Sequence, residues 1–317
     1  MKNFNIKVGV LGIVLSLGTF YSCQQEDELL NEELSSGKEV ALEDEYAAKG
    51  TCDPNEFKLI DAISGTDYND AVSTQIDDRS CSFDYRQSSY GSSFNWGGYR
   101  LRASNNQPGK LQVRMERSTR QTNYANGKYI DLSGTVRILN AGLVNGPYAP
   151  NDLRDKNGTY IAQVKGKHTN LRTDLNESRD PAIVLFIAKP KRFNNGTGSV
   201  IRDSNGKIKE FVIYAELVRK RGGSSNSGRR LIKITTVKRN RDFNVNIRTE
   251  FYNSGSTKRQ RVRVNINGVA KTFEISVQNT AGQSAEPTEM RIRMGAYRCV
   301  GGGAEILWKD DLSVSRN

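Results

Sequence analysis

Apolar and polar residues alternate one by one along much of the chain, which is the period of a β-strand with two different faces. The clearest example is the stretch from Gly158 to His168, GTYIAQVKGKH. Alternation places Tyr160, Ala162 and Val164 on one face and Ile161, Gln163, Lys165 and Lys167 on the other. We therefore expect the amide of Gln163 and the amine of Lys165 to point the same way from an exposed face, about 7 Å apart along the backbone.

The same pattern predicts an all-β fold from residue 94 onward, with turn signals such as Asn267-Gly268 between the runs. Residues 181–188, PAIVLFIA, are apolar on both faces and predict a central buried strand. The other predicted strands cover residues 96–103, 111–116, 129–139, 207–218, 231–237, 244–251, 261–266, 271–277, 289–300 and 304–314. No helical period persists beyond about one turn, except over residues 54–63 and in part of the acidic segment described below.

So many short strands predict a two-sheet antiparallel β-sandwich, a β-jelly roll of the concanavalin-like kind. Residues 222–228, GGSSNSG, are the clearest flexible loop and a candidate lid over a cleft.

The first 23 residues have the features of an export signal. Lys2 and Lys7 flank the start of an apolar run, residues 8–21, which is too short to span a bilayer comfortably and ends at Ser22-Cys23. This order is typical of a bacterial lipoprotein signal, in which residues 1–22 are removed and Cys23 is lipidated. An ordinary signal peptide with an incidental cysteine is the alternative.

The segment after Cys23 is acidic, with a net charge of −7 over residues 24–50. Its high charge and few apolar residues predict a disordered tether over residues 23–50. An acidic stretch after the lipidated cysteine resembles the signals that send some lipoproteins to the outer cell surface. We therefore expect an exported, cell-surface outer-membrane lipoprotein that meets the membrane only through its lipid anchor, with one folded domain over residues 51–317.

The folded domain is strongly basic. The whole chain carries a net charge of +12, and the acidic tether and the +2 of the signal leave +17 on residues 51–317. A domain this basic usually binds a polyanion. Outside the cell nucleic acid is not the expected partner, so an acidic polysaccharide is the leading candidate.

Three cysteines remain in the domain. Cys52 and Cys81 lie in similar contexts, TCDP and SCSF, and an oxidising compartment permits a disulfide between them, which leaves Cys299 over. There is no CxxC pair, and His168 is the only histidine, so we expect no metal centre built from these residues.

Two kinds of hydrolase fit the sequence poorly. A glycoside hydrolase needs two carboxylates at a matched separation, and no acidic pair shares a strand face outside the tether. A Ser/His/Asp triad would have to use His168, and the chain has no nucleophile elbow.

The strand predicted near the C-terminus carries candidate binding groups. In RIRMGAY, residues 291–297, alternation puts Arg291, Arg293, Gly295 and Tyr297 on one face. Gly295 removes a side chain between Arg293 and Tyr297, which would leave room for a ligand to approach the backbone. A guanidinium and a phenol on an open face suit a uronate; surface decoration is the alternative.

These residues carry a resemblance to a known family. RMGAYRCVGGGAEILWKDDLSV resembles the C-terminal signature of the jelly-roll polysaccharide lyases of the alginate-lyase-like group: a K-x-G-x-Y strand, a glycine-containing turn and a final strand. IAQVKG resembles their Gln-x-His strand, with Lys165 where the alginate lyases place His, and LQVRMERS resembles their Arg-x-Glu strand. The motifs occur in the family's order across residues 94–317. Lysine in place of histidine is most similar to the ulvan lyases of polysaccharide lyase family 28.

The resemblance implies an endo-acting lyase that cleaves an acidic, sulfated, uronic-acid-containing polysaccharide such as ulvan by β-elimination. Gln163, with Arg114 or Arg293, would stabilise the charge that builds on the substrate carboxylate. Lys165 would abstract the C5 proton as a neutral amine, a form that nearby cationic groups favour. Tyr297 would protonate the leaving O4, or in the alternative assignment act as the base.

No organic cofactor is required, nothing in the sequence specifies a structural cation such as calcium, and we expect a monomer. One alternative is a non-catalytic glycan-binding lipoprotein on the same fold. Another is a lyase for glucuronan or alginate. Ultraviolet absorbance separates lyase from binder, because only a lyase creates a C4–C5 double bond conjugated to the carboxylate.

Overall fold

The structure, a computed structural model, describes residues 59–61, 72–78, 84–87, 95–101, 114–142, 158–169, 182–194, 198–219, 228–278, 282–298, 303–309 and 312–317. Strands dominate these ranges, and every strand pairing among them is antiparallel. No helix in these ranges is long and apolar enough to cross a membrane.

One sheet, called sheet A, has nine strands. In spatial order they are β1 (Leu59–Asp61), β2 (Val72–Asp78), β5 (Arg114–Thr119), β17 (Glu289–Tyr297), β8 (Thr159–Lys165), β9 (Ala182–Pro190), β10 (Glu210–Val218) and β11 (Arg229–Lys238), with β6 (Thr122–Asn123) paired to β17.

The other sheet, called sheet B, has eight strands. They are β14 (Val269–Ile275), β13 (Thr257–Ile266), β12 (Asp242–Ser254), β7 (Tyr129–Asn140), β18 (Ala304–Lys309), β4 (Asn95–Leu101) and β3 (Asp84–Gln87), with β19 (Ser313–Arg316) paired to β7. The short strands β15 (Val277–Gln278) and β16 (Ser284–Ala285) pair with each other.

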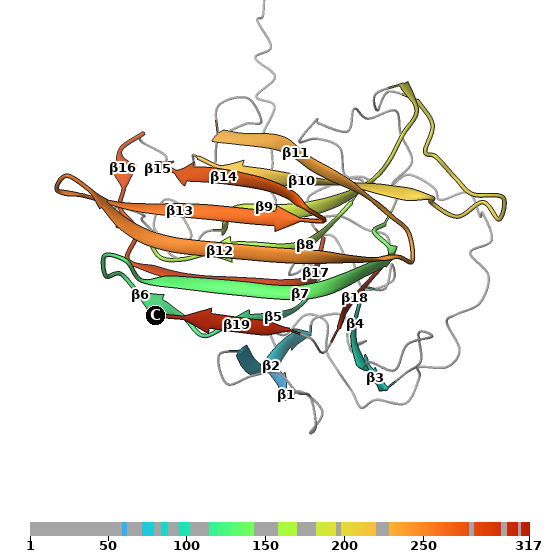
Figure 1. The fold of residues 1–317 in the computed structure, drawn as a ribbon, viewed down its shortest axis with the longest axis horizontal. Coiled ribbons are helices and arrows are strands. Elements are labelled where there is room, and N and C mark those ends of the chain that lie inside the picture. Colours follow the sequence, from blue (N-terminus) through green and yellow to red (C-terminus); the bar gives the residue numbers. More distant parts are fainter. Residues whose placement is uncertain are drawn as a thin grey trace, which may run out of the picture.

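The chain crosses repeatedly between the two sheets, as a jelly roll requires. It passes from β1 and β2 in sheet A to β3 and β4 in sheet B, returns for β5, and exchanges sheets again up to the final β17, β18 and β19. In Figure 1 sheet B lies in front and sheet A behind it. The predicted all-β, two-sheet antiparallel sandwich is confirmed.

The main core lies between the inner faces of the two sheets. Phe186 of β9 and Met294 of β17 face a layer that includes Ile247 of β12 and Trp308 of β18. A second, smaller apolar cluster covers part of the outer face of sheet A and includes Leu185. Because β9 packs on both faces, all nine of its residues are buried, which confirms the central strand predicted from its apolar run.

Two local predictions were wrong. Residues 59–61 form strand β1 within the predicted helical stretch 54–63, because they pair with β2. The single strand predicted over residues 304–314 is two, β18 and β19, which pair with different lengths of β7. Cys23, Cys52, Cys81 and Cys299, residues 1–50, and the candidate lid apart from Gly228 lie outside the described residues.

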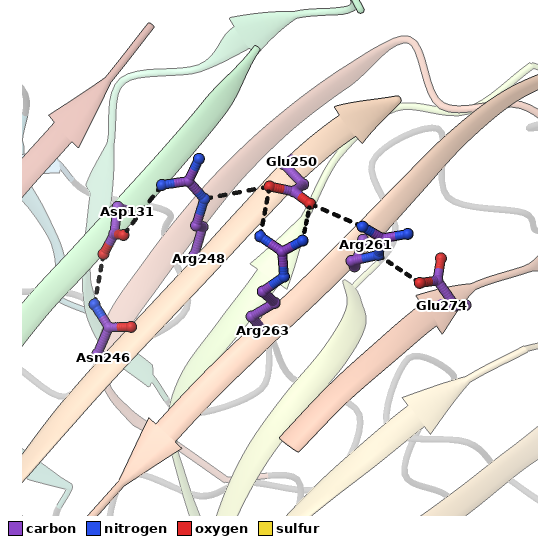
Figure 2. Close-up of polar contacts among 7 residues, drawn as sticks. All are labelled: Asp131, Asn246, Arg248, Glu250, Arg261, Arg263 and Glu274. Atoms are coloured by element: carbon purple, nitrogen blue, oxygen red, sulfur yellow. Dashed lines mark hydrogen bonds and ion pairs between the residues drawn. The ribbon is translucent and has the colours of Figure 1, made fainter. Parts of the chain in front are cut away.

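The outer face of sheet B carries a ladder of charges across β7, β12, β13 and β14 (Figure 2). Glu250 sits at its centre, 2.9 Å from Arg263 Nη2 and 3.3 Å from Arg261 Nη1. Arg248 bridges Glu250 to Asp131, and Arg261 also pairs with Glu274. Each carboxylate in this ladder faces a guanidinium, so the ladder itself is charge-balanced.

Candidate active site

The predicted site residues lie on three neighbouring strands of sheet A, on the face turned away from sheet B. Strand β17 runs between β5 and β8. In its register Arg293 lies opposite Gln163, while Tyr297 lies opposite both Arg114 and Tyr160. Lys165 lies opposite Arg291. The fold therefore brings Lys165, Gln163, Arg114, Arg293 and Tyr297 onto one surface from segments far apart in sequence.

The predicted faces of β8 were partly wrong, because the strand contains an irregularity. Its register with β9 shifts between Tyr160 and Ala162. Such a bulge moves one residue to the other face, so Ile161 and Ala162 both join the core, while Tyr160 joins the outer face with Gln163 and Lys165. The outer face is also less open than predicted, since Gln163 is only 2% exposed.

Glu116 holds the centre of the site. Its Oε1 accepts a hydrogen bond from Gln163 Nε2 at 2.5 Å. Its Oε2 lies 3.5 Å from Arg293 Nη1 and 3.8 Å from Arg114 Nη1. One buried carboxylate therefore orients an amide and two guanidinium groups, so the described part of the cluster holds two cations and one anion. This arrangement suits a bound carboxylate or sulfate.

Lys165 sits at the rim of this cluster, and its surroundings disfavour the ammonium form. Burial, followed by the charges of Arg293 and Arg114, holds the pKa of Lys165 well below its ordinary value, and Glu116 opposes this in part. Arg291 adds to the effect. A lysine so placed is available as a neutral amine, the form that accepts a proton.

Tyr297 lies at the other end of the cluster and has the opposite tendency. Its ring stacks on Tyr160 with centroids 5.3 Å apart, and the guanidinium of Arg114 lies 4.5 Å from its ring centroid. Burial raises the pKa of Tyr297 to about 12, although Arg114 acts in the lowering direction. The phenol is therefore kept protonated. Arg114 acts on both Lys165 and Tyr297, so the two share one electrostatic environment.

The buried ion pair between Glu216 and Arg229 holds the Tyr160 hydroxyl. The Tyr160 hydroxyl donates to Glu216 Oε2 at 2.5 Å, and Arg229 Nη1 pairs with Glu216 Oε1. Burial and the Glu216 carboxylate raise the pKa of Tyr160 well above its ordinary value. The pair fixes the ring on which Tyr297 stacks.

Sequence reasoning missed Glu116 and Glu216. Glu116 could have been predicted, because it is the glutamate of the Arg-x-Glu motif on β5. Glu216 had no signal, since its partners Tyr160 and Arg229 come from other strands.

The structure requires a glycine at position 295 for a different reason from the predicted one. Its φ is +137°, and a Cβ there would lie 2.2 Å from the carbonyl oxygen of Met115 and 2.8 Å from Tyr99 Cδ1. The glycine lets β17 approach β5, and it does not open a path for a ligand.

No group of three or more His, Cys, Asp or Glu side chains within the described ranges is arranged to hold a metal ion. Lipidation at Cys23 and a disulfide between Cys52 and Cys81 stay predictions from the sequence.

Comparison with known proteins places this site in context. A profile of the PL28 ulvan lyases matches residues 38–317. The chain is 37% identical over 239 residues to an endo-acting ulvan lyase of Formosa agariphila, which covers 74% of this chain and 41% of that protein. It is 30% identical over 241 residues to the ulvan lyase NLR42 of Nonlabens ulvanivorans, with 74% and 40% covered. The chain thus spans about two fifths of the length of these curated relatives.

Among solved structures, alginate lyase A1-II′ of polysaccharide lyase family 7 superposes with a TM-score of 0.44 at 11% identity, covering 74% of this chain and 83% of that chain.

Proposed function

The chain belongs to the PL28 ulvan lyases, and from this premise we propose that it is an endo-acting polysaccharide lyase that cleaves ulvan by β-elimination at a uronic acid. The observation that carries the proposal is the convergence of a depressed-pKa lysine, a protonated tyrosine and an oriented amide–guanidinium cluster on one face of sheet A. The anionic polysaccharide is the expected partner, and the chemistry needs only side chains.

The first task of the site is to make the C5 proton acidic. Gln163, Arg114 and Arg293 would contact the substrate carboxylate and stabilise the charge that gathers on it as C5 loses its proton. Glu116 holds these three groups in place before substrate arrives, which removes part of the cost of ordering them.

The elimination then moves one proton in and one proton out. The neutral amine of Lys165 takes the proton from C5, and the C5–H electron pair becomes the C4–C5 double bond. The C4–O4 bond breaks, and the leaving O4 takes a proton from the Tyr297 hydroxyl. Lys165 is left as an ammonium and Tyr297 as a phenolate, and proton exchange with water restores both.

The alternative assignment, with Tyr297 as base, fits the electrostatics less well. Burial raises the pKa of Tyr297 to about 12, so a phenolate is costly to form, whereas the environment of Lys165 favours its neutral form. These directions favour Lys165 as base and Tyr297 as acid.

The test uses Lys165→Ala and Tyr297→Phe with Lys167→Ala as a matched control. Lys167 lies two residues from Lys165, but its side chain is 51% exposed and pairs with Glu289. Incubation with ulvan, glucuronan, alginate and heparin, followed by ultraviolet absorbance of the new double bond, measures both activity and preference. We expect activity on ulvan in the wild type and the control, and a loss of about a hundredfold or more in each site variant.

Full activity in both site variants would overturn the assignment of residues. Binding of ulvan by the wild type with no new absorbance would instead favour the non-catalytic glycan-binding protein. Turnover of glucuronan or alginate in preference to ulvan would change the assigned substrate and keep the mechanism.

A further inference from the structure

The connection between β9 and β10 builds a small ladder beyond the end of sheet A. Residues 191–193 pair with 199–201 through bonds from Phe193 N to Ser199 O (3.0 Å) and from Ile201 N to Lys191 O (2.9 Å). Residues 201–203 pair in turn with 207–209 through bonds from Lys209 N to Ile201 O (2.9 Å) and from Asp203 N to Lys207 O (2.8 Å). Figure 1 shows this yellow segment projecting past the strands.

The pairing decides which side chains share a face. The bridges Arg192↔Val200 and Arg202↔Ile208 put these four residues on one face. Ile208 is buried, so that face is turned toward the core. The residues between them lie on the opposite face. On it Phe193 stands beside Ser199, Lys191 and Lys209 flank Ile201, and Lys207 stands beside Asp203.

Phe193 is held outward by its backbone. It is 53% exposed, and it is the one large apolar side chain in the described residues that is classed as exposed. Its amide donates to Ser199 and its carbonyl accepts from the Gly198 amide at 3.0 Å, while Asn194 takes a positive φ of 51° to complete the turn. The paired backbone around Phe193 therefore fixes the side of the ladder from which its ring projects.

Basic residues outnumber acidic ones in the ladder and in the neighbouring turn between β11 and β12. Residues 191–210 and 238–242 hold eight basic and three acidic residues. The acids already have partners: Asp203 caps its own turn by accepting from the Asn205 and Lys207 amides, Glu210 pairs with Lys191, and Asp242 pairs with Arg137. Lys207 and Lys209 are exposed and have no carboxylate partner within the described residues.

The ladder lies on the same side of sheet A as the active site. Lys191 Nζ is 2.5 Å from Glu210 Oε2. Glu210 lies on the same face of β10 as Val212 and Tyr214, which belong to the outer apolar cluster. Tyr160 of the site lies opposite Ile187, four residues before Lys191 on β9. At about 3.3 Å per residue, Lys191 is roughly 13 Å from the level of Tyr160, and Phe193 roughly 20 Å.

We propose that Phe193, Lys207 and Lys209 form a second contact surface, separate from the active site, for the same anionic polysaccharide chain. The ring would stack on the apolar face of a sugar, and the amines would meet sulfate or carboxylate groups of neighbouring units. This surface, which we call the distal platform, rests on the proposed function for the identity of its ligand. Two contacts on one polymer raise its affinity through effective concentration, which a short fragment cannot exploit.

The test measures binding without turnover, in the full chain carrying Lys165→Ala. The probes are intact ulvan and an ulvan disaccharide too short to span both places. The variants are Phe193→Ala, Phe193→Trp and the pair Lys207→Gln/Lys209→Gln. The control pair Lys271→Gln/Arg316→Gln removes the same charge from exposed positions on sheet B.

Phe193→Ala and the Lys207/Lys209 pair should each raise the Kd for ulvan about tenfold or more, while the Kd for the disaccharide stays the same. Phe193→Trp and the control pair should bind ulvan like the background protein. With Lys165 restored, the platform variants should raise the KM for ulvan and leave kcat unchanged.

Unchanged ulvan affinity in the platform variants would overturn the proposal, as would an equal loss for the disaccharide or an equal loss in the control pair. The two proposals fail separately. A wild type that forms no double bond on ulvan, together with platform variants that bind it weakly, would sink the lyase assignment and keep the platform. A wild type that cleaves ulvan, together with platform variants that bind ulvan as tightly as the background protein does, would keep the lyase assignment and overturn the platform.

Discussion

At the scale of single residues, Lys165 depends on its neighbours for its character as a base. Arg291 lies opposite it on β17 and lowers its pKa, yet makes no assigned contact with substrate. We predict that Arg291→Gln raises the pKa of Lys165. An amine accepts a proton only above its pKa, so the acid limb of the kcat/KM profile should move to higher pH while the plateau above it is kept.

The measurement is kcat/KM on ulvan over a pH series. Arg248→Gln, on the outer face of sheet B, removes the same charge far from the site and should leave the limb in place. A limb that stays fixed in Arg291→Gln would mean that another group sets it.

The buried pair Glu216–Arg229 makes a second prediction at this scale. Glu216→Gln leaves the guanidinium of Arg229 without its carboxylate, and the loss of stability should be about 3 kcal/mol. Replacing both, as Glu216→Leu with Arg229→Met, should restore much of it, because no unpaired charge is left. Turnover should stay low in both, because the Tyr160 hydroxyl loses its carboxylate acceptor, which glutamine replaces only with a neutral amide and leucine does not replace at all, and the stack with Tyr297 loosens.

Chemical denaturation measures the contribution of the Glu216–Arg229 pair to stability, and kcat on the same preparations measures its contribution to positioning Tyr297. Recovery of kcat together with stability in the double variant would show that the pair only packs, and does not position Tyr297.

Strand alternation placed Gln163 with Lys165 and Arg293 with Tyr297, and the family motifs added Arg114. Pairing between strands hid Glu216. Gln163 and Lys165 are two positions apart, so period alone places them together. Glu216 is 56 residues from Tyr160, and its role arises only when β8, β9 and β10 are set side by side. No local pattern in the sequence encodes that register.

At the scale of elements, the close approach of β17 and β5 depends on Gly295. We predict that Gly295→Ala costs more than about 3 kcal/mol, because the new Cβ would lie 2.2 Å from a backbone oxygen that cannot move without breaking the sheet. The control is Gly255→Ala, which also has a positive φ, +61°, but meets nothing within 4 Å and should cost about 1 kcal/mol. Denaturant unfolding of both compares clash with conformational strain.

Equal losses of stability in Gly295→Ala and Gly255→Ala would contradict the packing argument.

The strands themselves were well predicted, because the apolar period and the turn residues are local features of the sequence. The bulge in β8 was not, since one extra residue changes which face Tyr160 joins without changing the composition. The break between β18 and β19 was likewise hidden, because both segments alternate and only their partners on β7 differ.

At the scale of the whole molecule, the described charges are balanced differently on the outer faces of the two sheets. The ladder on the outer face of sheet B pairs each carboxylate with a guanidinium (Figure 2), so it contributes little net field. In the cluster on the outer face of sheet A, the described residues place one carboxylate, Glu116, beside Arg114 and Arg293, with Lys165 and Arg291 on neighbouring positions. The net charge of +12 was visible in the sequence, but how the charges divide between the two faces was not.

This asymmetry predicts how turnover responds to salt. The screening length falls from about 30 Å at 0.01 M ionic strength to about 3 Å at 1 M. The KM for ulvan should therefore rise steeply over this range. The chemical step should change little, because its charges lie close together and are little exposed: the side chains of Arg114 and Arg293 are 12% exposed and that of Glu116 2%. Arg263→Gln on sheet B should leave the salt dependence as it is in the wild type, since its charge is already balanced by Glu250 on the far face. Steady-state kinetics across ionic strength check both statements. A KM insensitive to salt, or one that Arg263→Gln makes insensitive, would place the attracting charge somewhere other than sheet A.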